Sequence, residues 1–345
     1  MTADMHSALG GIAVSILAGA VGGSHLMPMK YVRKWPWENT WLVYSIFAYL
    51  LFPWFAAIFT VPHLLAVYGE SGRGVLLMVS VLGLAWGAGV VLYGMALAIV
   101  GLSLTSGIIL GSSVALGSLI PLLALEPARL GTWAGAQIVG ADLLIVLGVM
   151  LCARAGSLRD LLKSSGVAQV RDPRFARGIL ICFISGLLAP LLNIALTLGA
   201  EITKRVVADG ANPFWAANGV WGLTVTFGSL PSLGLCLIRL RQNRSWPSFH
   251  NAMNPRNSLF CFLMGVGSIF STVLYGSAAG LLGNWGPVVG WPIYMSALII
   301  GNNFWGWYTG EWKGSRGVPV YTMFAGIAVQ VAGIGLLGSS RLSGH

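Results

Sequence analysis

Two titratable side chains lie inside long apolar runs of the sequence, where an ionisable group is costly. Asp142, in Gln137-Ile-Val-Gly-Ala-Asp142-Leu-Leu, is the one acid of ten at the centre of such a run. A charge in hydrocarbon costs from about 3 kcal/mol upward, so a carboxyl there is a candidate for binding a coupling ion, a proton above all. The alternative is a carboxyl that bonds a neighbouring helix or a second subunit.

His25 is the second titratable candidate, in Gly22-Gly-Ser-His25-Leu-Met-Pro28-Met-Lys30. Imidazole titrates near neutral pH, so this ring is suited to relaying a proton or bonding a substrate hydroxyl. The alternative is a packed ring bonded to a nearby carbonyl, which Pro28 makes easier because proline has no N–H. The sequence leaves both interpretations open.

Aromatic and amide side chains recur at helical spacing in the same runs. Trp86 and Tyr93 are seven residues apart, and Trp291 and Asn302 share one helical face. Aromatic planes and amides together suit a neutral, hydroxyl-rich solute, because the planes contact C–H faces and the amides orient oxygens. The alternatives are interfacial belts and bonds between helices. The candidate binding residues are Trp86, Tyr93, Asn193, Tyr275, Trp291 and Asn302.

The elements that position these residues must lie in a membrane. Of 345 residues, 56% are hydrophobic and 9% charged, against about 25% charged in a soluble domain. The 47 glycines suit helices that pack backbone to backbone in lipid. The net charge of +10 does not indicate nucleic-acid binding, because the bases stand between apolar runs. These features exclude a soluble globular protein.

Ten apolar runs are long enough to span a bilayer, which takes about 20 residues. Together they predict an all-α polytopic membrane protein. The predicted spans are approximately residues 8–29, 41–61, 75–99, 103–124, 133–153, 177–199, 214–238, 258–281, 287–308 and 318–338.

The distribution of basic residues predicts the orientation of these spans. Fifteen of the twenty Lys and Arg residues fall in the odd-numbered connections, and five fall in the even-numbered ones and the C-terminus. Cytoplasmic loops carry the excess of bases. We therefore expect the odd connections in the cytoplasm and both termini outside a bacterial cytoplasmic membrane.

An odd number of spans per half makes the two halves inverted in topology. We predict repeats over residues 1–160 and 161–345, which place Gly11 and Gly19 of the first span in register with Gly178 and Gly186 of the sixth. Inverted repeats build secondary transporters with a substrate site between the halves.

The chain lacks the motifs of the other common membrane functions. It has no Walker A sequence, no H-E-x-x-H and no G-x-S-x-G, and its four cysteines stand singly. We therefore expect no enzyme, no cofactor and no metal site. The expected partners are a small solute, a coupling ion and membrane lipid, and the oligomeric state is open.

Several segments resemble one transporter family over nearly the whole chain. They include Lys30-Tyr-Val-Arg-Lys-Trp-Pro-Trp-Glu38, Trp86-Gly-x-Gly-x-x-x-Tyr93-Gly, Gly101-Leu-Ser-x-x-x-Gly107, Trp291-x-x-x-Met295-Ser and Glu311-Trp312. These resemble the bacterial L-rhamnose:proton symporter family of the drug/metabolite transporter superfamily. The resemblance implies ten helices in two inverted repeats, and uptake of a deoxysugar with a proton.

The sequence thus predicts a secondary transporter of a neutral sugar, with L-rhamnose the first candidate, that works by alternating access. Lys30 and Glu38 are interpreted as gate or loop-anchoring residues. His25 and Asp142 stand where the enterobacterial pattern is apolar, so another sugar or ion site stays open. The alternatives are an exporter or exchanger of another small metabolite, or a membrane sensor.

Overall fold

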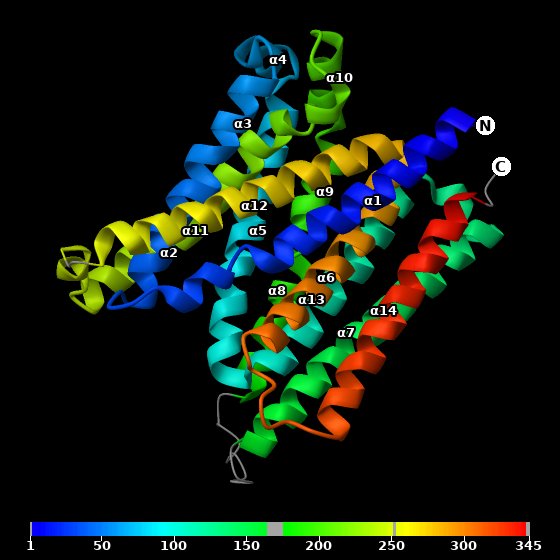
Figure 1. Ribbon diagram of the computed structural model, residues 1–345. Coiled ribbons are helices and arrows are strands. Elements are labelled where there is room, and N and C mark those ends of the chain that lie inside the picture. The colour runs from blue at the N-terminus through cyan, green and yellow to red at the C-terminus, as the bar shows by residue number, and fades with distance from the viewer. Residues whose placement is uncertain (1, 164–174, 251–252, 343–345) are drawn as a thin grey trace.

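The computed structural model describes residues 2–163, 175–250 and 253–342, and every regular element in them is helical (Figure 1). The long helices cross the bundle, and two short ones, α4 and α10, stand at one end of it. The helices are α1 (Thr2–Ser24), α2 (Trp37–Ser45), α3 (Phe52–Thr60), α4 (Leu64–Glu70), α5 (Arg73–Val100), α6 (Leu102–Leu125), α7 (Trp133–Lys163), α8 (Phe175–Leu188), α9 (Leu191–Leu198), α10 (Ala200–Ala208), α11 (Asn218–Gln242), α12 (Asn254–Leu282), α13 (Trp291–Tyr308) and α14 (Val318–Leu342).

The predicted spans are confirmed as helices. Nine stretches of the described chain are long and apolar enough to cross a membrane, and the longest, residues 254–308, contains both α12 and α13. The chain turns between those two helices at Gly283, where φ is +60°. Each of the ten predicted runs therefore coincides with one helix or one interrupted helix, and the bounds agree within about six residues except at the end of α7.

Two spans are interrupted where proline removes a backbone donor. The span over residues 37–60 contains a π-turn, η2 (Ile46–Leu51), immediately before Pro53, because residue 53 cannot donate the usual bond to residue 49. The sixth span breaks between α8 and α9 at Pro190 for the same reason. These breaks leave carbonyl groups that other helices must satisfy.

The structure adds features that apolar length did not predict. Helix α7 continues ten residues past the predicted end at 153, through a polar segment that reaches Lys163. The short helices α4 and α10 lie side by side (Figure 1), joined by Arg205 Nη1 to Glu70 Oε2 at 3.5 Å. They are too short to span a membrane, so the span analysis missed them.

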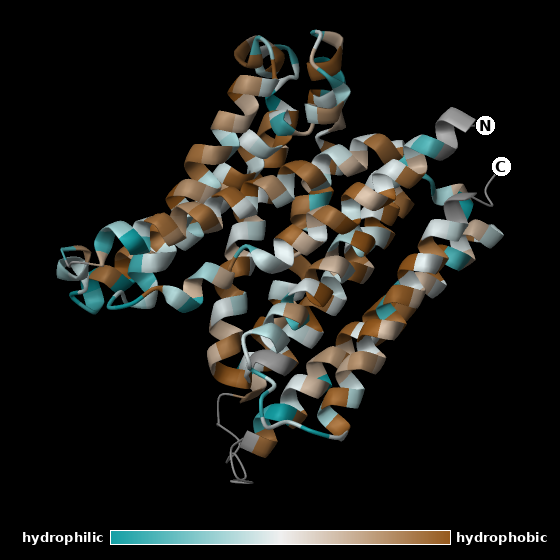
Figure 2. Cartoon of the chain, in the orientation of Figure 1, coloured by the Kyte–Doolittle hydropathy of each residue, from teal (hydrophilic) through white to brown (hydrophobic). Residues whose placement is uncertain are grey.

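The two ends of the bundle differ in which helices begin and finish there. Helices α1, α5, α7, α11 and α13 finish at one end, here called the basic end, whereas α1 begins and α14 finishes at the opposite end (Figure 1). Hydrophilic residues gather at the ends, and hydrophobic residues cover the long helices between them (Figure 2). This distribution fits a polytopic membrane protein.

The neighbours of each helix follow a two-fold pattern. Helix α1 packs on α12 and α13, and α8, the helix five spans later, packs on α5 and α6. Helix α5 packs on α11, and its counterpart α12 packs on α2. Helices α7 and α14 are counterparts of each other and pack along one another. These pairs of neighbours therefore recur when each span is exchanged for the one five positions away.

The glycines that aligned the two halves make equivalent contacts. A Cβ added at Gly11 would lie 2.6 Å from α12, and one at Gly178 would lie 2.6 Å from α5. Likewise, a Cβ added at Gly19 would contact α13, and one added at Gly186 would lie 3.0 Å from the nearest atom of α6. Only glycine permits these close approaches, so the shared register reflects shared packing.

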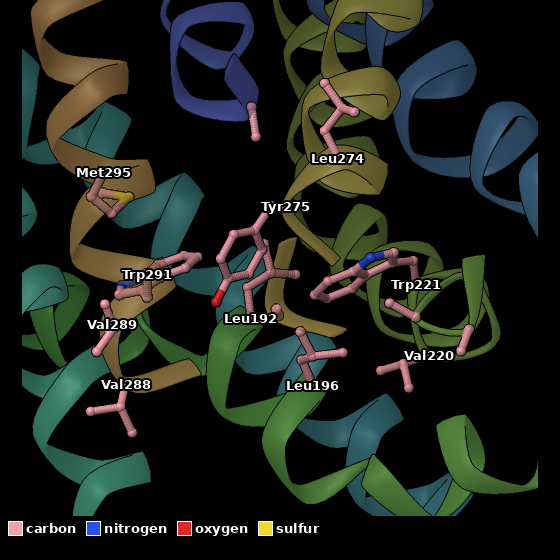
Figure 3. Packing of buried hydrophobic residues seen from close by; sticks show 14 of the residues in the cluster. Leu192, Leu196, Val220, Trp221, Leu274, Tyr275, Val288, Val289, Trp291 and Met295 are labelled. Atoms are coloured by element: carbon pink, nitrogen blue, oxygen red, sulfur yellow. The ribbon is translucent and has the colours of Figure 1, made fainter. Parts of the chain in front are cut away.

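The core is built from large buried side chains near the middle of the bundle (Figure 3). Trp221 of α11, Tyr275 of α12 and Trp291 of α13 lie in one row, and the rings of Tyr275 and Trp291 are 5.3 Å apart. Leu192 and Leu196 of α9 pack below them. This cluster separates the basic end from the opposite end.

Candidate substrate cavity and its closed side

A cavity of about 350 Å³ opens at the basic end, between α1, α5, α6, α7 and α13. Its volume lies in the range of small-molecule sites. At its deep end it reaches Leu110 of α6 and Ile299 of α13. The polar side chains that line it are Lys30, Tyr93, Ser106, Arg159, Asn302, Asn303 and Glu311.

The inner wall of the cavity presents uncharged hydrogen-bonding groups. The hydroxyls of Tyr93 on α5 and Ser106 on α6 bond each other at 2.8 Å, because the chain reverses at Gly101, φ +84°, and brings the two helices together. Asn303 donates to Ile299 O of its own helix at 2.9 Å. No side-chain bond of Asn302 is found in the described chain, and this amide is exposed. A solute hydroxyl would find both donors and acceptors here.

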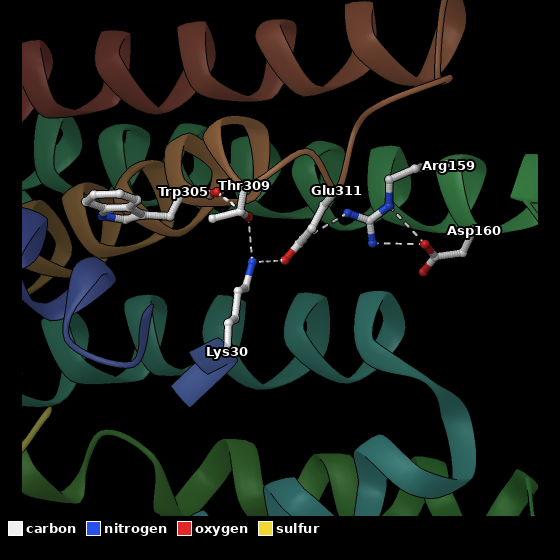
Figure 4. A network of polar contacts seen from close by, with 6 residues as sticks. All are labelled: Lys30, Arg159, Asp160, Trp305, Thr309 and Glu311. Atoms are coloured by element: carbon white, nitrogen blue, oxygen red, sulfur yellow. Dashed lines mark hydrogen bonds and ion pairs between the residues drawn. The ribbon is translucent and has the colours of Figure 1, made fainter. Parts of the chain in front are cut away.

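Charged residues surround the mouth of the cavity (Figure 4). Lys30 binds the Glu311 carboxylate and donates to Thr309 Oγ1 at 2.6 Å. Arg159 reaches the other oxygen of Glu311 at 3.4 Å and Asp160 at 2.9 Å. Among the residues that the structure describes, this network pairs two bases with two acids, so its own charges balance.

The charges at the mouth change the pKa of Glu311. Partial burial opposes ionisation of this carboxyl, but the hydrogen bond and charge of Lys30, with the charge of Arg159, outweigh it, so the pKa of Glu311 is lowered. Arg159 also stacks over Trp312, 5.1 Å from the ring centre. The carboxylate thus links the end of α1 to the end of α7.

Lys30 and Glu38, which the sequence placed together as gate or loop anchors, lie in different environments. Lys30 is at the mouth, whereas Glu38 is 5% exposed and accepts bonds from Asn243 at 2.9 Å and Ser245 at 2.8 Å. Glu38 therefore ties the start of α2 to the segment that follows α11. Lys30 pairs instead with Glu311, a residue that sequence reasoning did not select.

Beyond the deep end of the cavity, polar groups bond the helices together in a cluster here called the polar lock. Its side chains are Ser118 of α6, Asn193 of α9, Tyr275 of α12 and Trp291 of α13. Asn193 donates to Gly117 O at 2.7 Å and Pro287 O at 3.0 Å, and accepts from Tyr275 Oη. Trp291 Nε1 donates to Ser113 O at 2.9 Å, and Ser118 Oγ donates to Val288 O at 2.8 Å.

Prolines create the acceptors of the polar lock. Pro121 cannot donate to Gly117 O, so that carbonyl lacks its helical partner. Pro292 likewise leaves Val288 O without an α-helical donor, and Pro287 O without a donor in the π-turn η7 (Gly286–Gly290). Each freed carbonyl is bonded by a side chain from another segment, which satisfies it without water.

Three predicted binding residues therefore belong to the lock in this conformation. Asn193, Tyr275 and Trp291 are at most 3% exposed and bond protein groups, whereas Tyr93 and Asn302 line the cavity. Trp86 lies in neither set: it packs edge-on against Tyr49 at 6.0 Å.

His25 lies outside the cavity lining and points toward α2. Its Nδ1 is 2.6 Å from Gly22 O and its Nε2 is 3.1 Å from Tyr44 Oη. Since a carbonyl only accepts, Nδ1 carries a proton. The Tyr44 hydroxyl lies within hydrogen-bond distance of Nε2 and donates to Ser268 Oγ at 3.3 Å. Tyr44 Oη is 3.2 Å from Tyr49 Oη, which extends the chain of hydroxyls.

Asp142 lies deeper, on the face of α7 that continues from the cavity. It is 2% exposed, and within the described part of the chain neither carboxyl oxygen has a hydrogen-bond partner. Val149, seven residues along the same face, lines the cavity, so Asp142 is two turns, about 10 Å, beyond the open space. Ser118 is the side chain that interacts with this carboxyl.

Sequence reasoning missed Ser106, Arg159, Asn303 and Glu311. Arg159 was assigned to a loop because the extension of α7 past residue 153 was not predicted. Glu311 was also assigned to a loop, and it does lie in the turn that follows α13. The available signal for Glu311 was its place in the Glu311-Trp312 motif beside a basic connection. Ser106 and Asn303 carried no signal, since single polar residues in apolar helices commonly bond their own backbone.

Comparison with known proteins identifies relatives over nearly the full length. The chain matches the family described as L-rhamnose-proton symport protein (RhaT) over residues 5–341. It is 25% identical over 338 residues to the L-rhamnose-proton symporters of Salmonella paratyphi A and Salmonella newport. Each alignment covers 94% of this chain and 97% of the relative.

Proposed function

The chain belongs to the L-rhamnose-proton symport family, and on that premise we propose that it takes up L-rhamnose with protons across the cytoplasmic membrane. The observation that carries the proposal is the family match over residues 5–341. The cavity supports it, because about 350 Å³ lined by hydroxyls and amides suits an uncharged, hydroxyl-rich ring. Neither an enzyme activity nor a bound cofactor is part of this function.

We further propose that the basic end faces the cytoplasm. The odd-numbered connections predicted from the sequence hold fifteen of the twenty bases. The described helices that lead into them finish at the basic end, which supports the orientation by the positive-inside rule. The cavity would then be open to the cytoplasm and the polar lock would close the outer side. The conformation would be inward-facing, with both termini outside.

Transport would then consist of rocking between repeats 1–160 and 161–345. The two-fold pattern of helix neighbours supports this division. Opening the polar lock would expose Asn193, Tyr275 and Trp291 to the outer solution, together with Trp86, while the inner groups Tyr93 and Asn302 close. The six predicted binding residues would thus contact the sugar at different stages of one path.

Asp142 is our proposed proton site. Its carboxyl is buried, has no donor among the described residues, and lies beyond the deep end of the cavity on the same face of α7. His25 is the second candidate, because its ring joins a chain of hydroxyls at Tyr44 and Tyr49. If Asp142 is the proton site, substitution of Asp142 should abolish coupling. If His25 is the proton site, substitution of His25 should abolish it.

The first experiment measures substrate binding independently of coupling. Purified protein is heated with L-rhamnose, L-fucose, D-mannose and D-glucuronate at pH 6 and pH 8, since a ligand that binds the folded state stabilises it. L-Rhamnose should give the largest rise in Tm. A larger rise with another sugar would replace L-rhamnose, and no rise with any sugar would contradict a sugar site.

The second experiment separates the two proton candidates in proteoliposomes. Asp142→Asn should abolish accumulation of L-rhamnose against its gradient yet retain counterflow exchange, because exchange needs no net proton movement. His25→Asn should keep both activities. Uphill uptake by the Asp142→Asn protein would remove Asp142 from coupling, and loss of uphill uptake by the His25→Asn protein alone would assign coupling to His25.

A further inference from the structure

The register of α6 and α7 places Ser118 opposite Asp142. The two helices are antiparallel neighbours, and a Cβ at Gly107 would lie 3.1 Å from the Cβ of Ala153, so these positions face each other. Ser118 and Asp142 are each eleven residues, three turns, further along the same faces. The packing therefore places Ser118 and Asp142 at facing positions of the two helices.

Ser118 also belongs to the polar lock, and its hydroxyl has a single hydrogen. That hydrogen is donated to Val288 O at 2.8 Å, which leaves the lone pairs of Oγ free to accept. A protonated Asp142 can donate to them, so the neutral acid and the Ser118–Val288 bond are compatible. Both groups are buried, at 2% and 0% exposure.

An ionised Asp142 needs a hydrogen-bond donor, whereas the protonated acid needs an acceptor. A carboxylate accepts hydrogen bonds and has none to give, and a buried one without a donor is strongly disfavoured. Since Ser118 is the hydroxyl that faces Asp142 across the packing of α6 on α7, its hydrogen would have to turn to the carboxylate. Val288 O would then lose its donor, because Pro292 cannot supply one.

No other titratable group substitutes for Ser118 in the described side chains. Helix α6 carries none, and the remaining neighbours of α7 carry Arg129 (η3, Pro127–Gly131), Tyr294 and Tyr308 (α13), and Tyr321 (α14). None of these interacts with Asp142. On α7 itself the charged residues begin at position 154, twelve residues away.

We infer that Ser118 is a positioning residue that links the proton on Asp142 to the polar lock. This inference rests on the proposed symport. With the proton bound, Ser118 holds Val288 and the outer side stays closed. When the proton leaves, the hydroxyl turns to the carboxylate, the Ser118–Val288 bond opens, and the empty carrier returns to the outward-facing state. Proton release is thereby coupled to reopening.

The test follows the closed side directly and needs no substrate. Spin labels are attached at Glu126 and Asn284, whose side chains meet across the repeats at 3.5 Å, in a protein whose four native cysteines are replaced. The distance distribution is measured from pH 5 to pH 9. A longer-distance population should grow as the pH rises.

The variants assign that response to Ser118. Ser118→Ala and Asp142→Asn should each flatten the pH dependence, the double variant should match the single ones, and Ser118→Thr should restore it. Ser80→Ala is the matched control, since this buried hydroxyl of α5 bonds Leu76 O of its own helix. A wild-type pH response retained by Ser118→Ala, or no response in the wild type, would overturn the inference.

Transport assays distinguish this inference from the proposed function. Ser118→Ala should lower the accumulation ratio for L-rhamnose at least tenfold while counterflow changes less than twofold. If the wild type fails to take up L-rhamnose but its spin-label distances respond to pH through Ser118, the substrate assignment fails and the link stands. If uptake is proton-driven and Ser118→Ala accumulates normally, the link fails and the symport stands.

Discussion

Asn193 and Asn302 were both predicted from the sequence to bind the substrate, yet they lie in opposite environments. Asn193 is fully buried in the polar lock and uses both amide hydrogens and its carbonyl oxygen in protein bonds. Asn302 lines the cavity with its amide exposed. One region is dry and fully bonded, and the other is open with polar groups available. In the proposed transport cycle, these two regions are the closed and the open half of one pathway.

The closed half depends on directional bonds between segments, and the open half on side chains facing water. Losing an acceptor or donor in the dry region leaves buried partners unsatisfied, each at about 1–3 kcal/mol. Losing a polar group in the cavity costs less free energy, because water can replace its hydrogen bonds. Substitutions in the lock should therefore change which conformation is populated, whereas substitutions in the cavity should change sugar affinity.

The largest effect is expected from Asn193→Ala. Gly117 O, Pro287 O and Tyr275 Oη would all lose their partner, at an expected total of about 3 kcal/mol or more. The outer side should open, with the spin-label distance between residues 126 and 284 increasing, and uptake should fall on the order of 100-fold. Asn218→Ala is the control, because this buried amide bonds Thr60 outside the lock. An unchanged distance in Asn193→Ala would remove the lock from gating.

Substitutions in the cavity should have a smaller and different effect. Tyr93→Phe removes a hydroxyl that bonds Ser106, and Asn302→Ala removes an exposed amide. Each should raise the half-saturating L-rhamnose concentration about 3- to 10-fold, as expected for one or two neutral hydrogen bonds. The spin-label distance should not change. Tyr308→Phe, at the exposed end of α13, is the control, and a changed distance without a changed affinity would contradict the division between the two regions.

Glu38 tests whether a residue outside both regions affects folding alone. Glu38→Ala leaves Asn243 and Ser245 without their acceptor, which should cost about 1–3 kcal/mol and lower Tm by a few degrees. Uptake per folded molecule should stay within twofold. Glu70→Ala, where the carboxylate is exposed and paired at 3.5 Å, should leave Tm unchanged. A loss of uptake at constant Tm would instead return Glu38 to a gating role.

Much of the fold could be predicted because one physical signal, apolar length, controls it. Ten runs of about 20 apolar residues became helices with bounds within about six residues, apart from the extension of α7 through Lys163. The extension was missed because it is polar, and the pair α4 and α10 was missed because each helix is too short to span a membrane. The shared register of Gly11 and Gly178 also predicted equivalent positions in the two halves, since close helix packing tolerates few other residues.

The candidate site was predicted less well, because polarity in a span does not say what the polar group contacts. Tyr93 and Asn302 reach the cavity, whereas Asn193 and Tyr275 bond carbonyls and each other. The distinction depends on Pro121 and Pro292, whose freed carbonyls need donors from other helices. Reading each proline together with the carbonyl four residues earlier would have indicated where such donors are required.

The smallest effect is expected at the cavity mouth, where Lys30 and Glu311 are 41% and 43% exposed. Solvent screens such a pair, so Glu311→Gln should cost less than about 1 kcal/mol. The pKa of Glu311 is lowered in the folded protein, so its contribution is present above the unfolded pKa and is lost as the pH falls through the folded value. The Tm difference between wild type and Glu311→Gln should therefore be present at pH 7 and vanish well below pH 4.

The Lys30→Met variant and the double variant complete this test at the mouth. If the pair acts as drawn in Figure 4, the double variant should be no less stable than Glu311→Gln alone, and 0.5 M salt should remove the difference. A large, salt-independent loss of uptake in either single variant would instead make the mouth a gate comparable to the lock. The open half would then be controlled by directional bonds as the closed half is, and the contrast between the two regions would fail.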